Sequence, residues 1–207
     1  MAARTDYHNI AGTRCPTDFV ELPSTLMEYF CSAPTVLPLF ARHHLTDEPL
    51  SPDVLRRHVA PFQTFRPLST QHQIMYSVLD LTYHNSSGPV SSTAICQQVF
   101  EEYSLYPALP PDSRVSPQYT FTHLFPYGAS YYSYLFDRAI ADKVWKEVFE
   151  QDPLSREAGE RFLQEVLRWG AGRDPWDCVA GVLGQEDLKE GGKKAMERVG
   201  QWGIERT

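Results

Sequence analysis

The stretch YYSYLFDRAIADKVWKEVFE, residues 131–150, carries apolar side chains at the spacing of an amphipathic helix. Leu135, Ala139, Val144 and Val148 recur every four or five positions, so they would share one face of that helix. Similar patterns lie elsewhere, and no segment shows strong strand-like alternation; the other expected helices include residues 20–30, 36–43, 52–58, 92–103 and 155–169. The sequence therefore predicts an all-α protein.

Residues with known cap preferences set the expected helix starts in the first part of the chain. Asp18 is expected to cap the helix over residues 20–30, because a side-chain oxygen can accept a hydrogen bond from the first turn. Ser51, followed by Pro52 at the first helical position, should open the helix over residues 52–58.

Breakers and caps also divide the rest of the chain. A separate, longer helix should begin at Ser69 and end at the turn-forming HNSSGP, residues 84–89. Near the end of the chain, Asp174 should open a helix that Gly184 ends. Residues 185–207 are charged and at best moderately helical, so we expect them to form a tail.

Bulk composition excludes several classes of partner. The net charge is −7, and lysines and arginines cluster only in pairs, which gives no electrostatic footprint for nucleic acid or for a polybasic membrane patch. The four cysteines are scattered without a C-x-x-C pair, so neither a cysteine zinc site nor a disulfide framework is indicated. No apolar run approaches the roughly 18 residues that span a bilayer. We therefore expect no nucleic-acid or membrane partner.

A glutamate stands in an apolar setting within CPTDFVELPSTLMEYF, residues 15–30. Glu21 lies near the expected start of a helix, between Val20 and Leu22. A carboxylate buried there would be costly without a partner. The partner could be a metal ion or an arginine, and the side chain could instead face solvent.

The stretch FTHLFPYGASYYSYLF, residues 121–136, concentrates phenols around an imidazole. The residues concerned are His123, Tyr127, Tyr131 and Tyr134. Gly128 interrupts them and indicates a loop, which would let a substrate backbone approach closely. Convergent N–H and O–H donors suit a developing oxyanion, but the same pattern fits an aromatic core stripe with satisfied hydroxyls. Five other histidines lack acidic partners at metal-ligand spacing and are interpreted as surface or core residues: His43, His44, His58, His72 and His84.

Two of these stretches together resemble the thimet oligopeptidase family of zinc metallopeptidases. They are AGTRCPTDFVELPSTLMEYF, residues 11–30, and FTHLFPYGASYYSYLF, residues 121–136. Two further segments, RTDYHNIAGTRCPTDF at 4–19 and FARHH at 40–44, are most similar to the mitochondrial members. The resemblance implies the C-terminal portion of the helical catalytic domain of a zincin-type oligopeptidase.

The resemblance runs from Ala2 to about Gly184. It implies that residues 1–184 are the C-terminal part of the metallopeptidase catalytic domain, and that residues 185–207 are a charged C-terminal tail.

The resemblance also assigns roles to the residues of both stretches. The family's third zinc ligand, the glutamate of its D-F-V-E segment, corresponds to Glu21. By the same correspondence His123, Tyr127 and Tyr134 are expected to be catalytic, with Tyr134 the main donor to the oxyanion. The residues expected to bind substrate are Tyr131, Gly128 and Gly12.

One element of the family pattern is missing from the chain. The family carries an H-E-x-x-H helix, whose two histidines bind zinc and whose glutamate activates water, and no such motif occurs here. The chain is expected to start just after that helix, and any targeting segment would lie upstream of Met1. We therefore expect the isolated chain to be inactive, and one zinc ion to be bound only by the complete protein.

The expected function follows from the resemblance. It implies a zinc metalloendopeptidase of the mitochondrial matrix that removes an N-terminal octapeptide from imported precursor proteins and acts as a monomer. A general cytosolic oligopeptidase of the same family is the first alternative. A non-catalytic helical remnant that binds peptides without zinc is the second.

Overall fold

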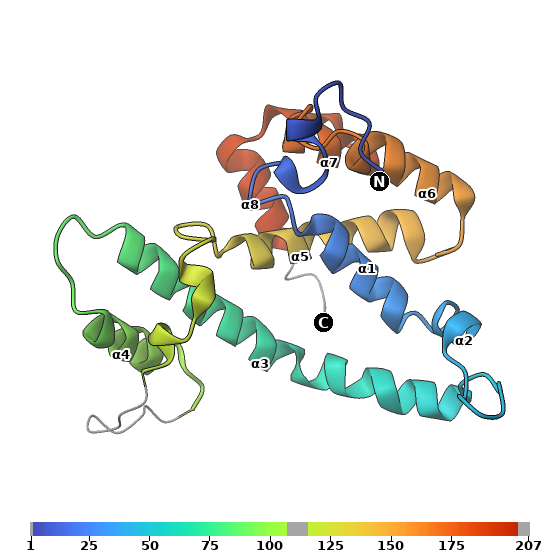
Figure 1. The fold of residues 1–207 in the computed structure, drawn as a ribbon, viewed down its shortest axis with the longest axis horizontal. Helices are drawn as coiled ribbons and strands as arrows, with labels where there is room; N and C mark the ends of the chain where they lie inside the picture. Colours follow the sequence, from blue (N-terminus) through green and yellow to red (C-terminus); the bar gives the residue numbers. More distant parts are fainter. Residues whose placement is uncertain (1, 107–115, 203–207) are drawn as a thin grey trace. The chain divides into compact units, whose positions relative to one another are not determined.

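The computed structural model describes residues 2–106 and 116–202, apart from the side chains of Phe62 and Gln63. Within these ranges the chain forms helices and no β-strand, with a single isolated bridge between Arg42 and Pro49 (Figure 1). The predicted all-α class is confirmed. The α-helices are α1 Leu22–Ser32, α2 Leu37–Phe40, α3 Pro52–His84, α4 Ser92–Tyr103, α5 Ser133–Val144, α6 Arg156–Phe162, α7 Pro175–Leu183 and α8 Gly192–Trp202.

The chain divides into two compact units. The first unit comprises Met1–Ala60 and Phe136–Thr207, and the second unit comprises Pro61–Leu135. The backbone passes from one unit to the other within α3 and again within α5. Each unit has its own hydrophobic core.

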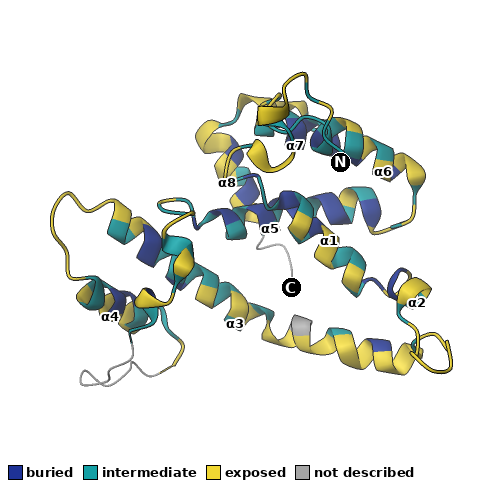
Figure 2. Ribbon diagram, viewed as in Figure 1, coloured by how far each residue is buried: buried dark blue, intermediate teal, exposed yellow. Residues whose placement is uncertain are grey.

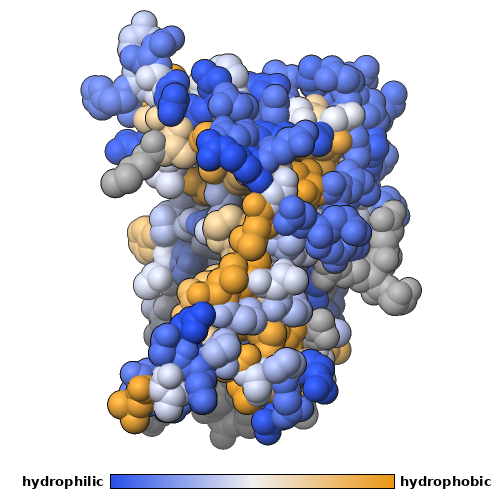
Figure 3. All heavy atoms as spheres, turned by 90° about the vertical axis from the view of Figure 1, so that its right-hand side faces the viewer, coloured by the Kyte–Doolittle hydropathy of each residue, from blue (hydrophilic) through white to orange (hydrophobic). Residues whose placement is uncertain are grey.

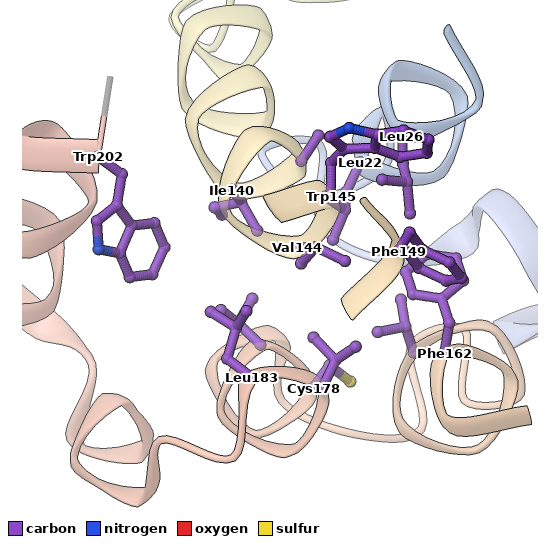
Figure 4. Packing of buried hydrophobic residues seen from close by; sticks show 14 of the residues in the cluster. Leu22, Leu26, Ile140, Val144, Trp145, Phe149, Phe162, Cys178, Leu183 and Trp202 are labelled. Carbon is purple, nitrogen blue, oxygen red and sulfur yellow. The ribbon is translucent and has the colours of Figure 1, made fainter. Parts of the chain in front are cut away.

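The core of the first unit joins the two ends of the sequence. Leu22 and Leu26 of α1 pack with residues of α5 and with the π-helical turn Trp145–Phe149 that follows it (Figure 4). Phe30 places its ring edge-on against Trp145, with ring centroids 5.0 Å apart. Buried residues are concentrated in α5 and α7 (Figure 2). Burying this much apolar surface is the main stabilising contribution of the unit.

The core of the second unit is smaller and largely aromatic. Leu79 of α3 packs against Cys96 and Val99 of α4. Tyr76, one turn earlier on α3, stacks on Phe121 with ring centroids 4.3 Å apart. These contacts tie α3 to the segment that precedes α5.

Two predicted helices in the first part of the chain are present with different bounds. Helix α1 begins at Leu22 rather than at residue 20, and its N-cap is Glu21 without a side-chain cap hydrogen bond, so Asp18 is not the cap. Helix α2 covers only Leu37–Phe40, which is shorter than the predicted 36–43. In contrast, Ser51 accepts a hydrogen bond from the N–H of Val54 at 3.4 Å, as predicted for a cap.

The prediction of two helices over residues 52–84 was also wrong. Helix α3 runs without a break from Pro52 to His84, so Ser69 lies in its interior and caps nothing. Pro61 and Pro67 both lie inside the helix, and each removes one backbone hydrogen bond. The predicted end at HNSSGP is confirmed.

Helices in the C-terminal third match their predictions closely. Helix α5 continues into the π-helical turn Trp145–Phe149, and α6 continues into the π-helical turn Leu163–Leu167. Asp174 caps α7 by accepting a hydrogen bond from the N–H of Trp176 at 2.8 Å, and Gly184 ends that helix in the left-handed conformation.

The expected tail is partly folded. A 3₁₀ turn at Glu186–Glu190 and α8 cover much of residues 185–202. Their apolar residues belong to the core of the first unit: Leu188, Ala195, Val199 and Trp202. Ala195, Val199 and Trp202 recur at i, i+4 and i+7, so the sequence of α8 does carry the apolar stripe of an amphipathic helix among its charged residues.

Several apolar side chains reach the surface. Leu39 and Phe40 of α2 are 57% and 62% exposed, and Leu45 is 80% exposed. Figure 3 shows apolar residues among hydrophilic ones on one face of the molecule. Surfaces of this kind favour association with other chains. Among the described helices, none is long and apolar enough to cross a membrane.

A pair of glycine substitutions tests the packing of the N-terminal segment. Gly170 has φ +53°, and a Cβ there would overlap the carbonyl oxygen of Ile10. Gly170→Ala should therefore lower the free energy of unfolding by about 2–4 kcal/mol, measured by urea denaturation. Gly159 lies exposed in α6 with nothing within 4 Å of its Cβ position. Gly159→Ala should therefore raise the free energy of unfolding by about 0.5–1 kcal/mol. Equal effects at both positions would contradict the described packing.

Thiol reactivity tests the core itself. Cys178 is fully buried, and burial raises the pKa of its thiol to about 12, whereas Cys31 is exposed. With Ellman's reagent at pH 8, Cys178 should react at least about 100-fold more slowly than Cys31 in the native chain. Urea should remove the difference. Mass spectrometry after brief alkylation identifies each labelled cysteine. Rapid labelling of Cys178 in the native chain would contradict its burial in the core.

Candidate functional site

Four predicted residues form one aromatic cluster in the second unit. His123 lies in the 3₁₀ turn Thr122–Leu124, and its ring centroid is 5.7 Å from that of Tyr127, 5.8 Å from Tyr131 and 6.0 Å from Tyr134. The ring of Tyr134 is 5.3 Å from Tyr127 and 5.0 Å from Tyr131. We call these four residues the His/Tyr cluster.

A turn, not a continuous helix, brings the cluster together. Tyr127 precedes the turn and Tyr131 follows it, and the N–H of Ser130 donates to the carbonyl oxygen of Tyr127 at 2.8 Å. Helix α5 begins only at Ser133, so Tyr134 lies in its first turn. The loop that was predicted at Gly128 is therefore present, and it places residues from both of its sides against one another.

Burial separates Tyr131 from the other members of the cluster. Tyr131 is 6% exposed and packs edge-on against Phe121, with ring centroids 5.0 Å apart. His123, Tyr127 and Tyr134 are only half-buried. The cluster thus has an inner ring that packs in the core and three outer rings that can present donors to a bound molecule.

Two residues of α3 support the turn and were missed by the sequence analysis. Asp80 is fully buried and accepts hydrogen bonds from the N–H groups of Ala129 and Tyr131, both at 3.0 Å. His84 lies one turn further along α3, with its Nδ1 2.9 Å from Oδ1 of Asp80. The available signal is the acid-to-histidine spacing of four on a helix, so the prediction that His84 lacks an acidic partner is wrong.

Glu21 is held at the start of α1 in the first unit. Its N–H donates to Oδ2 of Asp137 at 3.0 Å, and its Oε2 accepts a hydrogen bond from the hydroxyl of Ser24 at 2.8 Å. The side chain is half-buried. A helix N-terminus anchored from two sides presents this carboxylate in a fixed position.

Asp137 is the buried neighbour of Glu21. Burial raises the pKa of the Asp137 carboxyl to about 8; the hydrogen bond from the N–H of Glu21 lowers it, and the nearby Asp18 and Glu21 carboxylates raise it. Its Oδ1 atom is buried and has no hydrogen-bond partner among the described residues. An unpaired buried oxygen of this kind is uncommon and suits a donor supplied by another segment.

The described residues do not form a complete metal site. No group of three or more histidine, cysteine, aspartate or glutamate side chains within them could hold a metal ion. A catalytic zinc needs three protein ligands, and Glu21 could supply one carboxylate oxygen. Further ligands would have to come from other residues, and the unpaired oxygen of Asp137 beside Glu21 is consistent with a missing neighbour.

The two predicted glycines differ in their surroundings. Gly12 has φ +63° in the turn Gly12–Arg14, and nothing lies within 4 Å of its Cβ position. A Cβ on Gly128 would lie 2.7 Å from Nε2 of His84. The backbone at Gly12 is therefore accessible, whereas a side chain at position 128 would collide with His84. Gly12 and Glu21 belong to the first unit, and the His/Tyr cluster belongs to the second.

Comparison with known proteins places this chain among peptidases. Mitochondrial intermediate peptidase of Coccidioides immitis is 50% identical over 220 residues, which cover 99% of this chain and 27% of the relative. The protein of the same name from Malassezia globosa is 46% identical over 204 residues, covering 99% of this chain and 25% of the relative. That of Pyricularia oryzae is 49% identical over 210 residues, covering 98% and 26%.

The chain thus spans about a quarter of the length of the curated relatives it matches. The sequence profile of peptidase family M3 matches residues 1–198, which include the His/Tyr cluster and Glu21. The chain therefore belongs to peptidase family M3.

Proposed function

We propose that this chain is the C-terminal part of a zinc metalloendopeptidase of the mitochondrial matrix, which removes an N-terminal octapeptide from imported precursor proteins. The observation that carries the proposal is the His/Tyr cluster, in which a turn gathers one imidazole and three phenols. Membership of family M3 and the shared name of the relatives support the reaction class and the compartment.

In this proposal the outer rings of the cluster bind the reacting peptide. Attack of water on a peptide carbonyl places negative charge on its oxygen, and donors that are already in position stabilise that charge. Tyr134 is the main donor, because it is half-buried and fixed by ring contacts on both sides. His123 and Tyr127 hold the substrate backbone or assist the same oxygen.

The three predicted substrate-binding residues have different roles in this proposal. Tyr131 acts mainly from the interior, where it supports the ring of Tyr134. Gly12 offers open backbone to which an extended peptide could approach closely. Gly128 contributes through the shape of the turn, since His84 occupies the space beside it.

Glu21 is proposed as one zinc ligand, and the remaining ligands come from a part of the enzyme that this chain does not include. A zinc ion bound in this way would activate water and polarise the carbonyl. The carboxylate is pre-positioned by the hydrogen bond between its own N–H and Asp137. The isolated chain should therefore be inactive.

The relatives favour this proposal over the alternatives. A general cytosolic oligopeptidase would share the cluster, but the three relatives named above are mitochondrial intermediate peptidases. A non-catalytic remnant would bind peptides without zinc. Zinc content and hydrolysis of a quenched peptide, with and without a chelator, distinguish these possibilities.

A chimaeric enzyme provides the assay. This chain replaces the C-terminal quarter of the Coccidioides immitis relative, to which it is 50% identical. Glu21→Gln should reduce the zinc content after dialysis from one ion per molecule to below about 0.1, because a neutral amide is a weak zinc ligand. Zinc is measured by atomic emission.

The matched control is Glu28→Gln, an exposed acid on the same helix, which should retain zinc fully. The isolated chain, dialysed in parallel, should hold no stoichiometric zinc and should not hydrolyse peptide. Full zinc retention by the Glu21→Gln chimaera would show that Glu21 is not a ligand.

Substitution of Tyr134 tests the proposed oxyanion donor. In the chimaera, Tyr134→Phe should lower kcat by roughly 10²–10³-fold with little change in KM, as expected for loss of one donor that acts on the transition state. Steady-state hydrolysis of a quenched peptide measures both constants. Tyr119→Phe is the control, since Tyr119 is 72% exposed and outside the cluster. Normal turnover by Tyr134→Phe would mean that this ring only packs.

A further inference from the structure

We propose that Asp80 is a positioning residue that holds the turn of the His/Tyr cluster in its working conformation. The inference rests on the proposed function for the role of the cluster, but it stands on its own for the structure of the turn. Asp80 lies on α3, and the turn begins about 48 residues later in the chain, at Gly128.

The carboxylate of Asp80 is fully engaged by the turn and its own helix. Oδ1 accepts from the N–H of Ala129 and Oδ2 accepts from the N–H of Tyr131, both at 3.0 Å. The side chain is completely buried. A buried carboxylate is tolerated when several donors satisfy it, so the turn and the acid depend on each other.

The backbone of the turn needs this support. Ala129 has φ +60°, one of only two non-glycine residues with positive φ within the described ranges. A residue with a Cβ occupies that region at a cost of about 1–2 kcal/mol, so other contacts must hold it there. The hydrogen bond from Ala129 to Asp80 is such a contact, and it comes from the strained residue itself.

His84 closes the other side of the turn. Its Nδ1 lies 2.9 Å from Oδ1 of Asp80, and its Nε2 would lie 2.7 Å from a Cβ on Gly128. The imidazole therefore fills the space that only a glycine leaves free. Asp80 binds the turn through two N–H groups, and His84 packs against it.

The arrangement fixes the two halves of the cluster relative to each other. His123 and Tyr127 precede the turn, whereas Tyr131 and Tyr134 follow it. A change at Ala129 would shift one pair against the other, and displacements of about 1 Å at a reacting centre can cost roughly 10²-fold in rate. Asp80 acts through the turn and does not touch the substrate.

Hydrogen–deuterium exchange of the chain tests the hydrogen bonds directly. In Asp80→Ala, the amides of Ala129 and Tyr131 should exchange roughly 10- to 100-fold faster than in the wild type, measured residue by residue by NMR. Asp80→Asn retains the shape and one acceptor oxygen and should give a smaller increase. Ser77→Ala is the control, because this buried hydroxyl on α3 donates to the carbonyl oxygen of Gln73 in its own helix, at 2.7 Å.

Unchanged exchange at both amides in Asp80→Ala would overturn the proposal. If Asp80→Ala fails to fold, hydrogen exchange in Asp80→Asn decides the question. The loss of one acceptor oxygen must still accelerate exchange of the amide of Ala129 or Tyr131. Amides in α4 report on the stability of the second unit and should change no more than in Ser77→Ala.

Activity of the chimaeric enzyme tests the positioning role. Asp80→Asn should lower kcat at least about tenfold with a smaller change in KM, whereas Ser77→Ala should leave both near the wild-type values. If Tyr134→Phe impairs kcat but Asp80→Asn does not, the positioning role is wrong and the proposed function stands. If Tyr134→Phe has no effect, the proposed donor fails, and the exchange experiment still decides whether Asp80 holds the turn.

Discussion

The hydrogen bonds from the N–H groups of Ala129 and Tyr131 to the buried Asp80 carboxylate determine how the His/Tyr cluster is built. The two N–H groups take the place of water as hydrogen-bond donors to a fully buried carboxylate. They also hold Ala129, a non-glycine residue, at positive φ. The rings on either side of the turn then meet at centroid distances of 5.3–6.0 Å. A small aromatic core behind them, formed around Tyr76 and Phe121, keeps the inner ring in place.

The first unit has a similar arrangement at its candidate site residue, Glu21. Asp137 is also completely buried, and it accepts the N–H of Glu21 from a segment 116 residues earlier in the chain. In both units a helix supplies a buried acid that accepts backbone N–H groups of a distant segment, two at Asp80 and one at Asp137. The backbone, and not only the side chain, of each candidate residue is thereby fixed, which is what a preorganised site requires.

The sequence was most informative where local chemistry decides the structure. Asp174 and Gly184 bound α7 as predicted, because a cap depends on residues within one turn. Asp18 and Ser69 failed as caps, since the N-cap of α1 is Glu21, whose N–H is bound by Asp137, and α3 continues through Ser69 to His84. The cluster residues could be named from the sequence, but Asp80 and Asp137 could not, because their partners lie 49 to 116 residues away.

The division of the chain has a consequence for its synthesis. The second unit is one continuous segment, whereas the first unit is assembled from two pieces that flank it. Leu22 and Leu26 can be buried only after Ile140, Val144 and Trp202 have been synthesised, because these residues belong to the same core. During vectorial translation the second unit can therefore condense first on the ribosome, while α1 remains without its partners until the last helices emerge. Holding that apolar segment soluble in the interval is a task suited to a chaperone.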